Sequence, residues 1–439
     1  MRASTISYAS FVHGYFKKGH ACGKKRFPLL RSFHSLGSSS EQVLIWNDRI
    51  VFPTVVDSGS LLIDLNSGTI LESHQGECAT KAEDRASSLG GKYVNLQKIR
   101  PGGILAPGLI DVHTHISALG RDWEGYESAT KAAAAGGITT IMGMPLNSVP
   151  ATTTLDAVKE EVREAQFVDL LADVGLWGGV VPDSINDLPA LLTSPYIFGI
   201  KAFLSPLPPA AGYSAVSPSQ LHNVASLCGP RGLPILVHSE LMTETEIASA
   251  LEESFSCSTN QQDSSNSHSM YEAHVLSRPA EWERRAVEVV CRLSQVCHMH
   301  IVHLSDSGCL PMISHTKDLA SSQLTVETCP HYLLFDQSTI EEESRALVDT
   351  RFKCFPPIRD ARNREILLSE GLGFGLIDML GSDHSPCTPE MRLRETGDLK
   401  GAWGGLSGLQ YQFASSWQAL TSSVTAQGKP EDSLAPDFA

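Results

Sequence analysis

Short apolar runs alternate with longer amphipathic segments through most of the chain after residue 106. Each run has the length of a buried strand, roughly four to eight residues, and several are rich in β-branched residues. The runs occur at residues 109–115, 139–144, 173–180, 197–204, 234–239, 299–304, 324–329 and 376–382. The pattern therefore predicts eight strands, each separated from the next by a connecting segment.

Several of the connecting segments have helical periodicity. In the segment 155–165, the apolar residues Leu155, Val158, Val162 and Ala165 are spaced to lie on one face of a helix. The segments 128–135 and 281–294 are also compatible with helices. Strands that alternate with helices predict a parallel sheet, either closed as a (β/α)8 TIM-type barrel or open and doubly wound.

The part of the chain before residue 107 has a different pattern. Short strand-like runs at 43–46, 50–52 and 61–64 predict a small β unit, and the sequence Ala106-Pro107-Gly108 separates it from the eight alternating runs. We therefore divide the chain into four parts. These are a leader (1–40), part of a small β-sandwich that is incomplete (41–106), the barrel (107–415) and a C-terminal tail (416–439).

Charge adds two points to this picture. The formal net charge of −15 argues against binding to nucleic acid or to an anionic membrane. Residues 1–40 nevertheless contain no Asp or Glu, but several Lys, Arg and Ser residues, which is typical of an organellar transit peptide. The leader therefore predicts a mitochondrial location, with the endoplasmic reticulum and the cytoplasm as alternatives. The ten cysteines include no CxxC motif, and their scatter favours reduced thiols.

Six polar residues that can bind metal ions lie at the ends of the apolar runs. A lone histidine at such a position is most often structural, but four histidines, a lysine and an aspartate at strand ends form a specific pattern. The six are His113, His115, Lys201, His238, His303 and Asp383. Because catalytic groups gather at the C-terminal ends of barrel strands, this pattern favours the closed barrel over the open sheet.

The chemistry of these residue types predicts a metal-dependent hydrolase. His113 and His115 are two positions apart, so they point the same way from one strand and can hold one ion. Imidazole suits zinc and related metals, and two ions roughly 3.5–4 Å apart can activate water and polarise a carbonyl group. Asp383 can accept the proton of that water and return it to a leaving nitrogen. Lys201 fits such a site only if its charge is removed, as in a carbamate formed with carbon dioxide.

The same residues resemble the cyclic amidohydrolases, a family that includes allantoinases, dihydropyrimidinases or hydantoinases, and dihydroorotases. The segment Pro107 to His115 resembles the first-strand motif that these enzymes share. The resemblance is greatest to the allantoinase branch. It rests on the segments 144–148, 277–281, 326–332, 353–359, 382–387 and 402–408.

The resemblance implies a (β/α)8 barrel and a binuclear centre bridged by carboxylated Lys201. The other ligands would be His113, His115, His238, His303 and Asp383, with zinc as the expected metal and manganese or cobalt as alternatives. The implied reaction opens the hydantoin ring of allantoin to give allantoate. The resemblance also implies a homotetramer with a small-molecule substrate.

The sequence departs from the family pattern in two places. Residues 117–121 read Ser-Ala-Leu-Gly-Arg where the family has Asn-Glu-Pro-Gly-Arg, which changes a loop beside the pocket. The family chain also continues well beyond the Trp403-Gly404-Gly405 motif, so we expect an incomplete β-sandwich and lowered stability here. The remaining alternatives are a dihydropyrimidinase or hydantoinase, and a non-catalytic scaffold. A dihydroorotase is disfavoured because no arginine directly follows His115.

Overall fold

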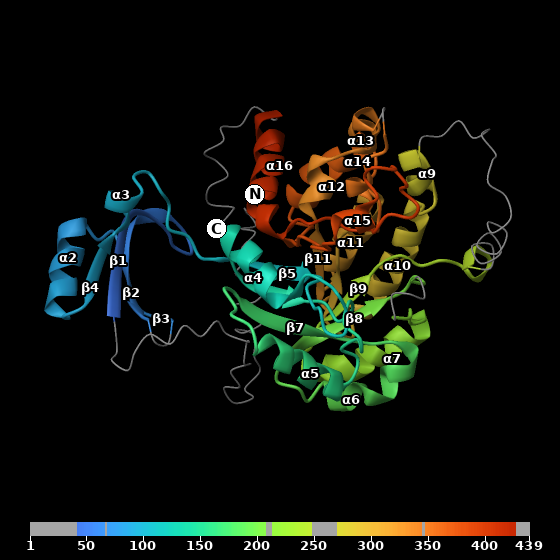
Figure 1. Ribbon diagram of the computed structural model, residues 1–439, viewed down its shortest axis with the longest axis horizontal. Helices are drawn as coiled ribbons and strands as arrows, with labels where there is room; N and C mark the ends of the chain where they lie inside the picture. Colours follow the sequence, from blue (N-terminus) through green and yellow to red (C-terminus); the bar gives the residue numbers. More distant parts are fainter. Residues whose placement is uncertain (1–41, 66–67, 208–212, 248–269, 345–346, 427–439) are drawn as a thin grey trace. The chain divides into compact units, whose positions relative to one another are not determined.

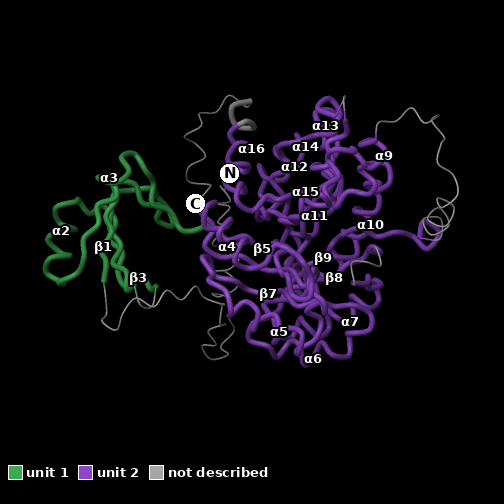
Figure 2. Tube along the Cα trace, viewed as in Figure 1, with its two compact units in different colours: residues 1–20, 32–109, 428–439 green, residues 21–31, 110–427 purple. Residues whose placement is uncertain are grey.

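The computed structural model describes residues 42–65, 68–207, 213–247, 270–344 and 347–426. They form two compact units, which Figure 2 colours separately and which meet in the sequence at Leu109 and Ile110. Residues 1–40, for which we expect a leader, lie outside the described residues. The same is true of the polar segment 254–269 and of residues 427–439.

The first unit is one four-stranded sheet in the order β3-β2-β1-β4 (Figure 1). Its elements are β1 (Gln42–Val51), β2 (Val56–Asp64), β3 (Thr69–Gln75), α2 (Ala79–Ser88), β4 (Lys92–Asn95) and α3 (Leu96–Ile99). Helix α2 places Ala82 and Ala86 against Leu44 and Leu62, which removes all four side chains from water. Within the described residues, the small domain consists of this sheet and its helices. We expect this domain to be part of a β-sandwich.

Strand β1 joins two runs that the sequence separates. The apolar pattern predicts strands at 43–46 and 50–52, but the structure has a single strand with an irregular register between Asn47 and Ile50. The polar residues in between are accommodated because Asn47 is buried and its side-chain amide donates hydrogen bonds to the carbonyl oxygens of Arg49 and Gly103. The irregularity lets the ladder continue across three polar positions.

The second unit is an eight-stranded barrel. Its strands are β5 (Leu109–Thr114), β6 (Ile138–Gly143), β7 (Asp173–Gly179), β8 (Ile197–Phe203), β9 (Ile235–His238), β10 (Met299–Ile301), β11 (Leu324–Thr328) and β12 (Met379–Leu380). They succeed one another in sequence order around the sheet, and a parallel bridge between Thr114 and His384 joins its two edges. The predicted (β/α)8 barrel is therefore confirmed, and the open sheet is excluded.

Helices surround the barrel strands (Figure 1). They are α4 (Gly125–Ala135), α5 (Leu155–Ala165), α6 (Leu188–Leu191), α7 (Pro218–Cys228), α9 (Met270–Leu276), α10 (Ala280–Leu293), α11 (Leu310–Lys317), α12 (Pro330–Leu334), α13 (Gln337–Glu343), α14 (Ala361–Ile366), α15 (Pro389–Arg392) and α16 (Gln412–Ala426). Helix α5 has the bounds that its periodicity predicts, because Thr154 caps it by accepting a hydrogen bond from Ala157. Its residues Val158 and Val162 are buried.

Helix α16 extends beyond residue 415, where the sequence predicts that the barrel ends. It lies against α12, with Ser416 and Ala419 buried (Figure 1). The Gln412 side chain donates a hydrogen bond of 2.8 Å to the carbonyl oxygen of Leu380 in β12. The first part of the expected tail is therefore a helix that contacts the barrel, and its weak apolar periodicity explains why the sequence does not reveal it.

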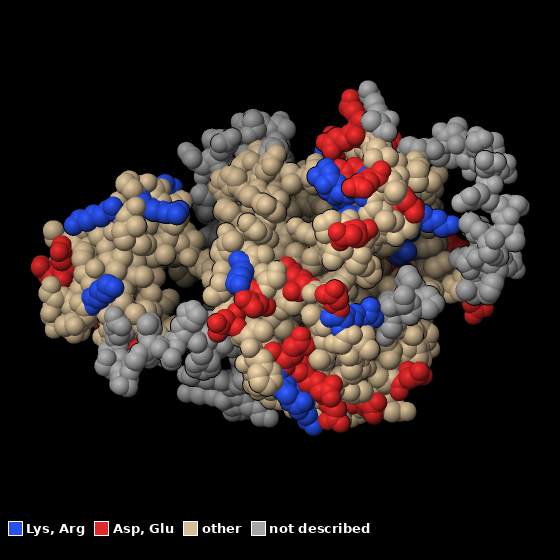
Figure 3. Space-filling model, viewed as in Figure 1, with Lys and Arg blue, Asp and Glu red and all other residues tan. Residues whose placement is uncertain are grey.

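The surface agrees with the acidic composition. On the face shown in Figure 3, acidic side chains gather over the part of the barrel unit that carries α5 and α6, with fewer basic side chains among them. A polyanion would be repelled from such a surface. Among the described residues, no helix is both long enough and apolar enough to cross a membrane.

Candidate metal centre

The end of strand β5 brings two histidines to one side of the barrel interior. His113 and His115 are both buried, and their ring centroids lie 5.4 Å apart. Their Nε2 atoms approach the same carboxylate oxygen, Oδ1 of Asp383, at 3.1 and 3.3 Å. These three side chains form one group of metal-binding atoms within 4.8 Å of one another.

Asp383 comes after the last strand of the barrel, β12. Its φ angle of 46° is unusual for a residue other than glycine, and His303 after β10 has a similar φ of 41°. Such conformations cost about 1–3 kcal/mol each and gather at functional sites. These backbone conformations also end β10 and β12 earlier than the apolar runs at 299–304 and 376–382 predict. The chain turns at these points, and both side chains belong to the central cluster.

The other candidates complete the cluster. The ring centroid of His303 lies 5.4 Å from that of His113 and 4.6 Å from that of His238. The imidazole of His238 stacks on the ring of Phe203, and the Lys201 ammonium lies 5.0 Å from the centroid of the same ring. All six residues that the sequence singles out thus come together in one buried cluster.

Electrostatics inside the cluster favour neutral nitrogen ligands. Burial lowers the pKa of His303 well below its ordinary value, and burial also lowers the pKa values of His115 and His238. For His113, burial acts in the same direction, but the carboxylates of Asp383 and Glu327 outweigh it and raise its pKa to about 9. A divalent cation in the cluster would replace the proton that His113 holds between these carboxylates.

Lys201 is the most unusual member. Its side chain is almost completely buried, and this burial lowers its pKa to about 8, although Asp383 and Glu327 act in the opposite direction. A buried amine that is partly neutral near physiological pH can react with carbon dioxide, whereas a fully protonated lysine cannot.

A layer of polar residues orients the ring nitrogens. His113 Nδ1 lies 2.8 Å from Glu327, His115 Nδ1 lies 3.0 Å from Asn147, and His238 Nε2 lies 2.6 Å from Glu240. In His113 and His115 the second ring nitrogen, Nε2, lies near Oδ1 of Asp383. His113 Nε2 is buried and makes no well-angled hydrogen bond within the described residues, as expected of an atom placed to bind a cation. The donor set therefore fits divalent metal ions.

This supporting layer is not identified as such from the sequence. Glu240 has the clearest signal, since it is an acidic residue only two positions after His238. Glu327 and Asn147 lie within segments that carry the resemblance, at 326–332 and 144–148, but no spacing rule connects either to a distant histidine.

His331, His384 and Cys354 lie near the motifs but are not among the six candidate residues. His384 uses both ring nitrogens, one with Glu124 at 2.8 Å and the other as acceptor for the backbone of Leu409. His331 is buried beside the cluster, and its pKa is lowered by burial to about 4. Burial likewise raises the pKa of Cys354 to about 12, which is consistent with packing rather than nucleophilic chemistry.

Comparisons with known proteins agree with this geometry. The amidohydrolase family model matches residues 104–384. The chain is 40% identical to an allantoinase of Arabidopsis thaliana over 333 residues, which cover 72% of this chain and 60% of the relative. It is 33% identical to an allantoinase of Streptomyces avermitilis over 382 residues, covering 86% of this chain and 77% of the relative.

Solved structures share the fold. An L-hydantoinase (dihydropyrimidinase) from Arthrobacter aurescens superposes with a TM-score of 0.72 at 24% identity, covering 91% of this chain and 80% of that one. A dihydropyrimidinase from Brevibacillus agri superposes with a TM-score of 0.70 at 20% identity, covering 90% and 79%.

The chain spans about 60% of the length of several curated relatives that it matches, including an allantoinase of Aquarana catesbeiana described as mitochondrial. The family model nevertheless covers more than half of the chain, and the strand ends that carry the cluster lie within or next to the matched residues. The chain belongs to the amidohydrolase family.

Proposed function

We propose that the chain is an allantoinase, which hydrolyses the cyclic amide bond of allantoin to give allantoate. The observation that carries the proposal is the buried cluster of four histidines, a lysine and an aspartate. These residues lie at or near the C-terminal ends of the strands in a barrel whose curated relatives are allantoinases. The solved structures described above are hydantoinases or dihydropyrimidinases, but at identities under 25% they support only the fold.

The cluster would hold two divalent metal ions, with zinc as the expected metal and manganese or cobalt as alternatives. His113, His115 and Asp383 form one set of ligands, and His238 and His303 supply a second. Lys201, carboxylated to a carbamate, would contribute to both. When bound, such ions polarise the ring carbonyl of the substrate and make a water molecule more acidic.

The protein's own residues would position the reactants and move protons. Asp383 would accept a proton from the attacking water. Burial raises the pKa of this carboxyl group, but the charge of His113 and the contacts with both β5 histidines outweigh burial and hold the pKa well below its ordinary value. A bound cation that replaced the His113 proton would act in the same direction. Asp383 would then donate this proton to the ring nitrogen as the amide C–N bond breaks, leaving a carboxylate and a free ureido group. The buried setting would exclude bulk water.

The direct test compares substrates on metal-loaded protein. We expect a higher kcat/KM for allantoin than for hydantoin or dihydrouracil, because the relatives at 32–40% identity are allantoinases. A higher value for hydantoin or dihydrouracil would overturn the assignment within the family. Loss of turnover in His113→Ala, with turnover retained in His222→Ala on the outer helix α7, would link the activity to the cluster.

Two further features belong to the same proposal. We infer a homotetramer from the resemblance to the family, which sedimentation analysis would test. We also infer an organellar destination, most readily the mitochondrion, from the basic and acid-free residues 1–40. Fusing these residues to a fluorescent protein would test the destination, with endoplasmic reticulum or cytoplasm as the alternative outcomes.

A further inference from the structure

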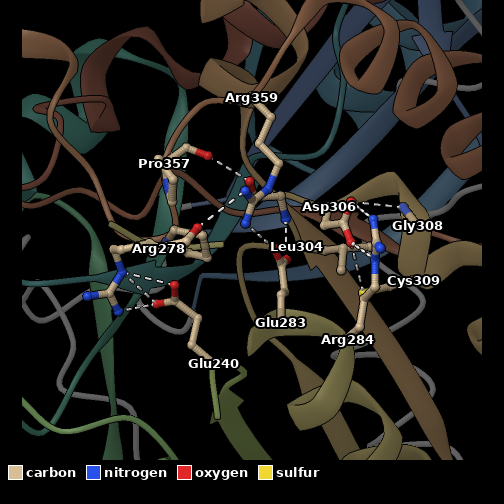
Figure 4. Close-up of polar contacts among 12 residues, drawn as sticks. Glu240, Arg278, Glu283, Arg284, Leu304, Asp306, Gly308, Cys309, Pro357 and Arg359 are labelled. Atoms are coloured by element: carbon tan, nitrogen blue, oxygen red, sulfur yellow. Dashed lines mark hydrogen bonds and ion pairs between the residues drawn. The ribbon is translucent and has the colours of Figure 1, made fainter. Parts of the chain in front are cut away.

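Five of the six segments that carry the resemblance contain none of the six candidate ligands, and two of these five contact each other. These two are Ser277 to Glu281, before and at the start of α10, and Lys353 to Arg359, in the loop after η5 (Thr350–Phe352). Arg278 of the first segment contacts the carboxylate of Glu240, which lies two residues after His238, and the second segment contacts Arg278 in turn (Figure 4). Their shared location suggests a shared role in supporting the cluster.

Glu240 connects a candidate ligand to an arginine. It is completely buried, and Oε2 lies 2.6 Å from His238 Nε2. Arg278 approaches the same carboxylate through Nε, at 2.9 Å from Oε1, and through Nη2, which donates to Oε2 (Figure 4). Because the carboxylate accepts from Nε2 of His238, that nitrogen carries the proton and Nδ1 keeps the free electron pair.

Arg278 is itself held from several sides. Its guanidinium carbon lies 4.7 Å from the centroid of the Phe355 ring and 5.7 Å from that of the Trp282 ring. Its backbone carbonyl oxygen accepts a hydrogen bond of 3.4 Å from Arg359 Nη1 (Figure 4). Phe355 and Arg359 both belong to the second segment, which explains why the two segments occur together.

The same network reaches the next strand. Arg359 pairs with the buried carboxylate of Glu283 at 3.3 Å, and Glu283 accepts a hydrogen bond of 2.7 Å from the backbone nitrogen of Ser305. Ser305 lies two residues after His303, as Glu240 lies two residues after His238. Helix α10 and the loop after η5 therefore support the chain just beyond both histidines of the second proposed ligand set.

We propose that Arg278 is a positioning residue that acts through Glu240 to fix the tautomer and orientation of His238, so that Nδ1 is presented to a metal ion. The inference rests on the metal centre of the proposed function. A buried carboxylate without a cationic partner is strongly destabilised, so Glu240 keeps its orientation only while Arg278 is present. Lysine would not replace arginine fully, because it lacks the planar fork that contacts both oxygens.

The experiment compares Arg278→Gln with Arg284→Gln. Arg284 lies on α10 and pairs with the buried Asp306 at 2.7 Å, and within the described residues this pair makes no hydrogen bond or ion pair to a histidine. Metal content, metal affinity and the absorption spectrum of the cobalt-loaded protein are measured in the absence of substrate. We expect Arg278→Gln to lower the affinity for one of the two ions by about 10–100-fold and to change the cobalt spectrum. Arg284→Gln should match the wild-type protein in both respects.

A second variant protects the test against misfolding. If circular dichroism shows that Arg278→Gln is unfolded, Glu240→Gln keeps the side-chain shape while it removes the charge that fixes His238. A folded variant of either kind with wild-type metal affinity and an unchanged cobalt spectrum would overturn the inference. Wild-type protein that binds no metal would overturn it too, together with the proposed centre. Wild-type protein that binds two ions without hydrolysing allantoin would contradict only the proposed substrate. The comparison of the variants would still test the role of Arg278.

Discussion

Lys201 is the residue whose chemistry depends most on its surroundings. Burial lowers its pKa to about 8, against the attraction of Asp383 and Glu327. The amine is protonated below that pH and neutral above it, and only the neutral amine attacks carbon dioxide. At a fixed concentration of dissolved carbon dioxide, metal-free protein given zinc should therefore regain activity faster as the pH rises from about 7 to about 9.

The matched control is Lys201→Arg, which keeps a positive charge but forms no carbamate. It should not regain activity at any pH in this range. A recovery rate that does not change with pH, or recovery in the arginine variant, would contradict the proposed carbamate.

Asp383 is the proposed proton carrier. Asp383→Asn keeps the shape of the side chain but leaves no group that can accept and return a proton. We expect kcat to fall by about 10²–10⁴-fold, the usual contribution of general acid–base catalysis. Asp378→Asn, at the other end of β12, is the control and should stay within a few-fold of wild type. A comparable loss in both variants would indicate a structural effect.

Sequence reasoning was most successful for residues that end strands. That the six candidate residues would meet could be predicted because they lie at or near the C-terminal ends of apolar runs, which parallel strands bring together. Their role as metal ligands stays a prediction. The partners Glu327 and Asn147 could not be paired with their histidines in the same way. Their contacts depend on which side chains face one another across the barrel, and a linear pattern does not contain that information.

At the scale of elements, the close packing of β8 against β9 holds Lys201 in place. A Cβ atom on Gly199 would lie 2.6 Å from the carbonyl oxygen of Pro234, a distance that backbone atoms cannot tolerate. Gly199→Ala should therefore push β8 away from β9, lower the melting temperature and reduce metal content. Gly143→Ala in β6 is the control, because its nearest contact would be an ordinary 3.4 Å.

Both variants add one methyl group to a barrel strand, but only the methyl group on Gly199 would meet a backbone atom at a forbidden distance. Calorimetry and metal analysis on both would separate strand displacement from a general effect of alanine. Equal melting temperatures and equal metal contents in the two variants would show that β8 tolerates the methyl group on residue 199. This result would contradict the predicted displacement of β8.

The strands and the amphipathic helix α5 could be predicted because periodicity determines them. The early ends of β10 and β12 could not, because His303 and Asp383 adopt positive φ angles that only the folded surroundings stabilise. Helix α16 was also missed as a barrel helix, since its contacts with α12 depend on tertiary packing rather than on a strong apolar stripe.

At the scale of the whole molecule, bound metal should contribute to stability. Ions that bind the folded protein at 100 times their Kd stabilise it by about 2.7 kcal/mol each. Removing them with a chelator should lower the melting temperature by about 5 °C or more, and added zinc should restore it. An unchanged melting temperature after complete metal removal would mean that the cluster is not a strong metal site.

The central claim is that this chain assembles a binuclear centre that opens the ring of allantoin. The most direct measurement determines metal content and allantoate formation on one sample of purified protein. We predict about two divalent ions per chain, with allantoate formed in proportion to the metal-loaded fraction. Bound metal without allantoate, or allantoate formed by metal-free protein, would contradict the claim.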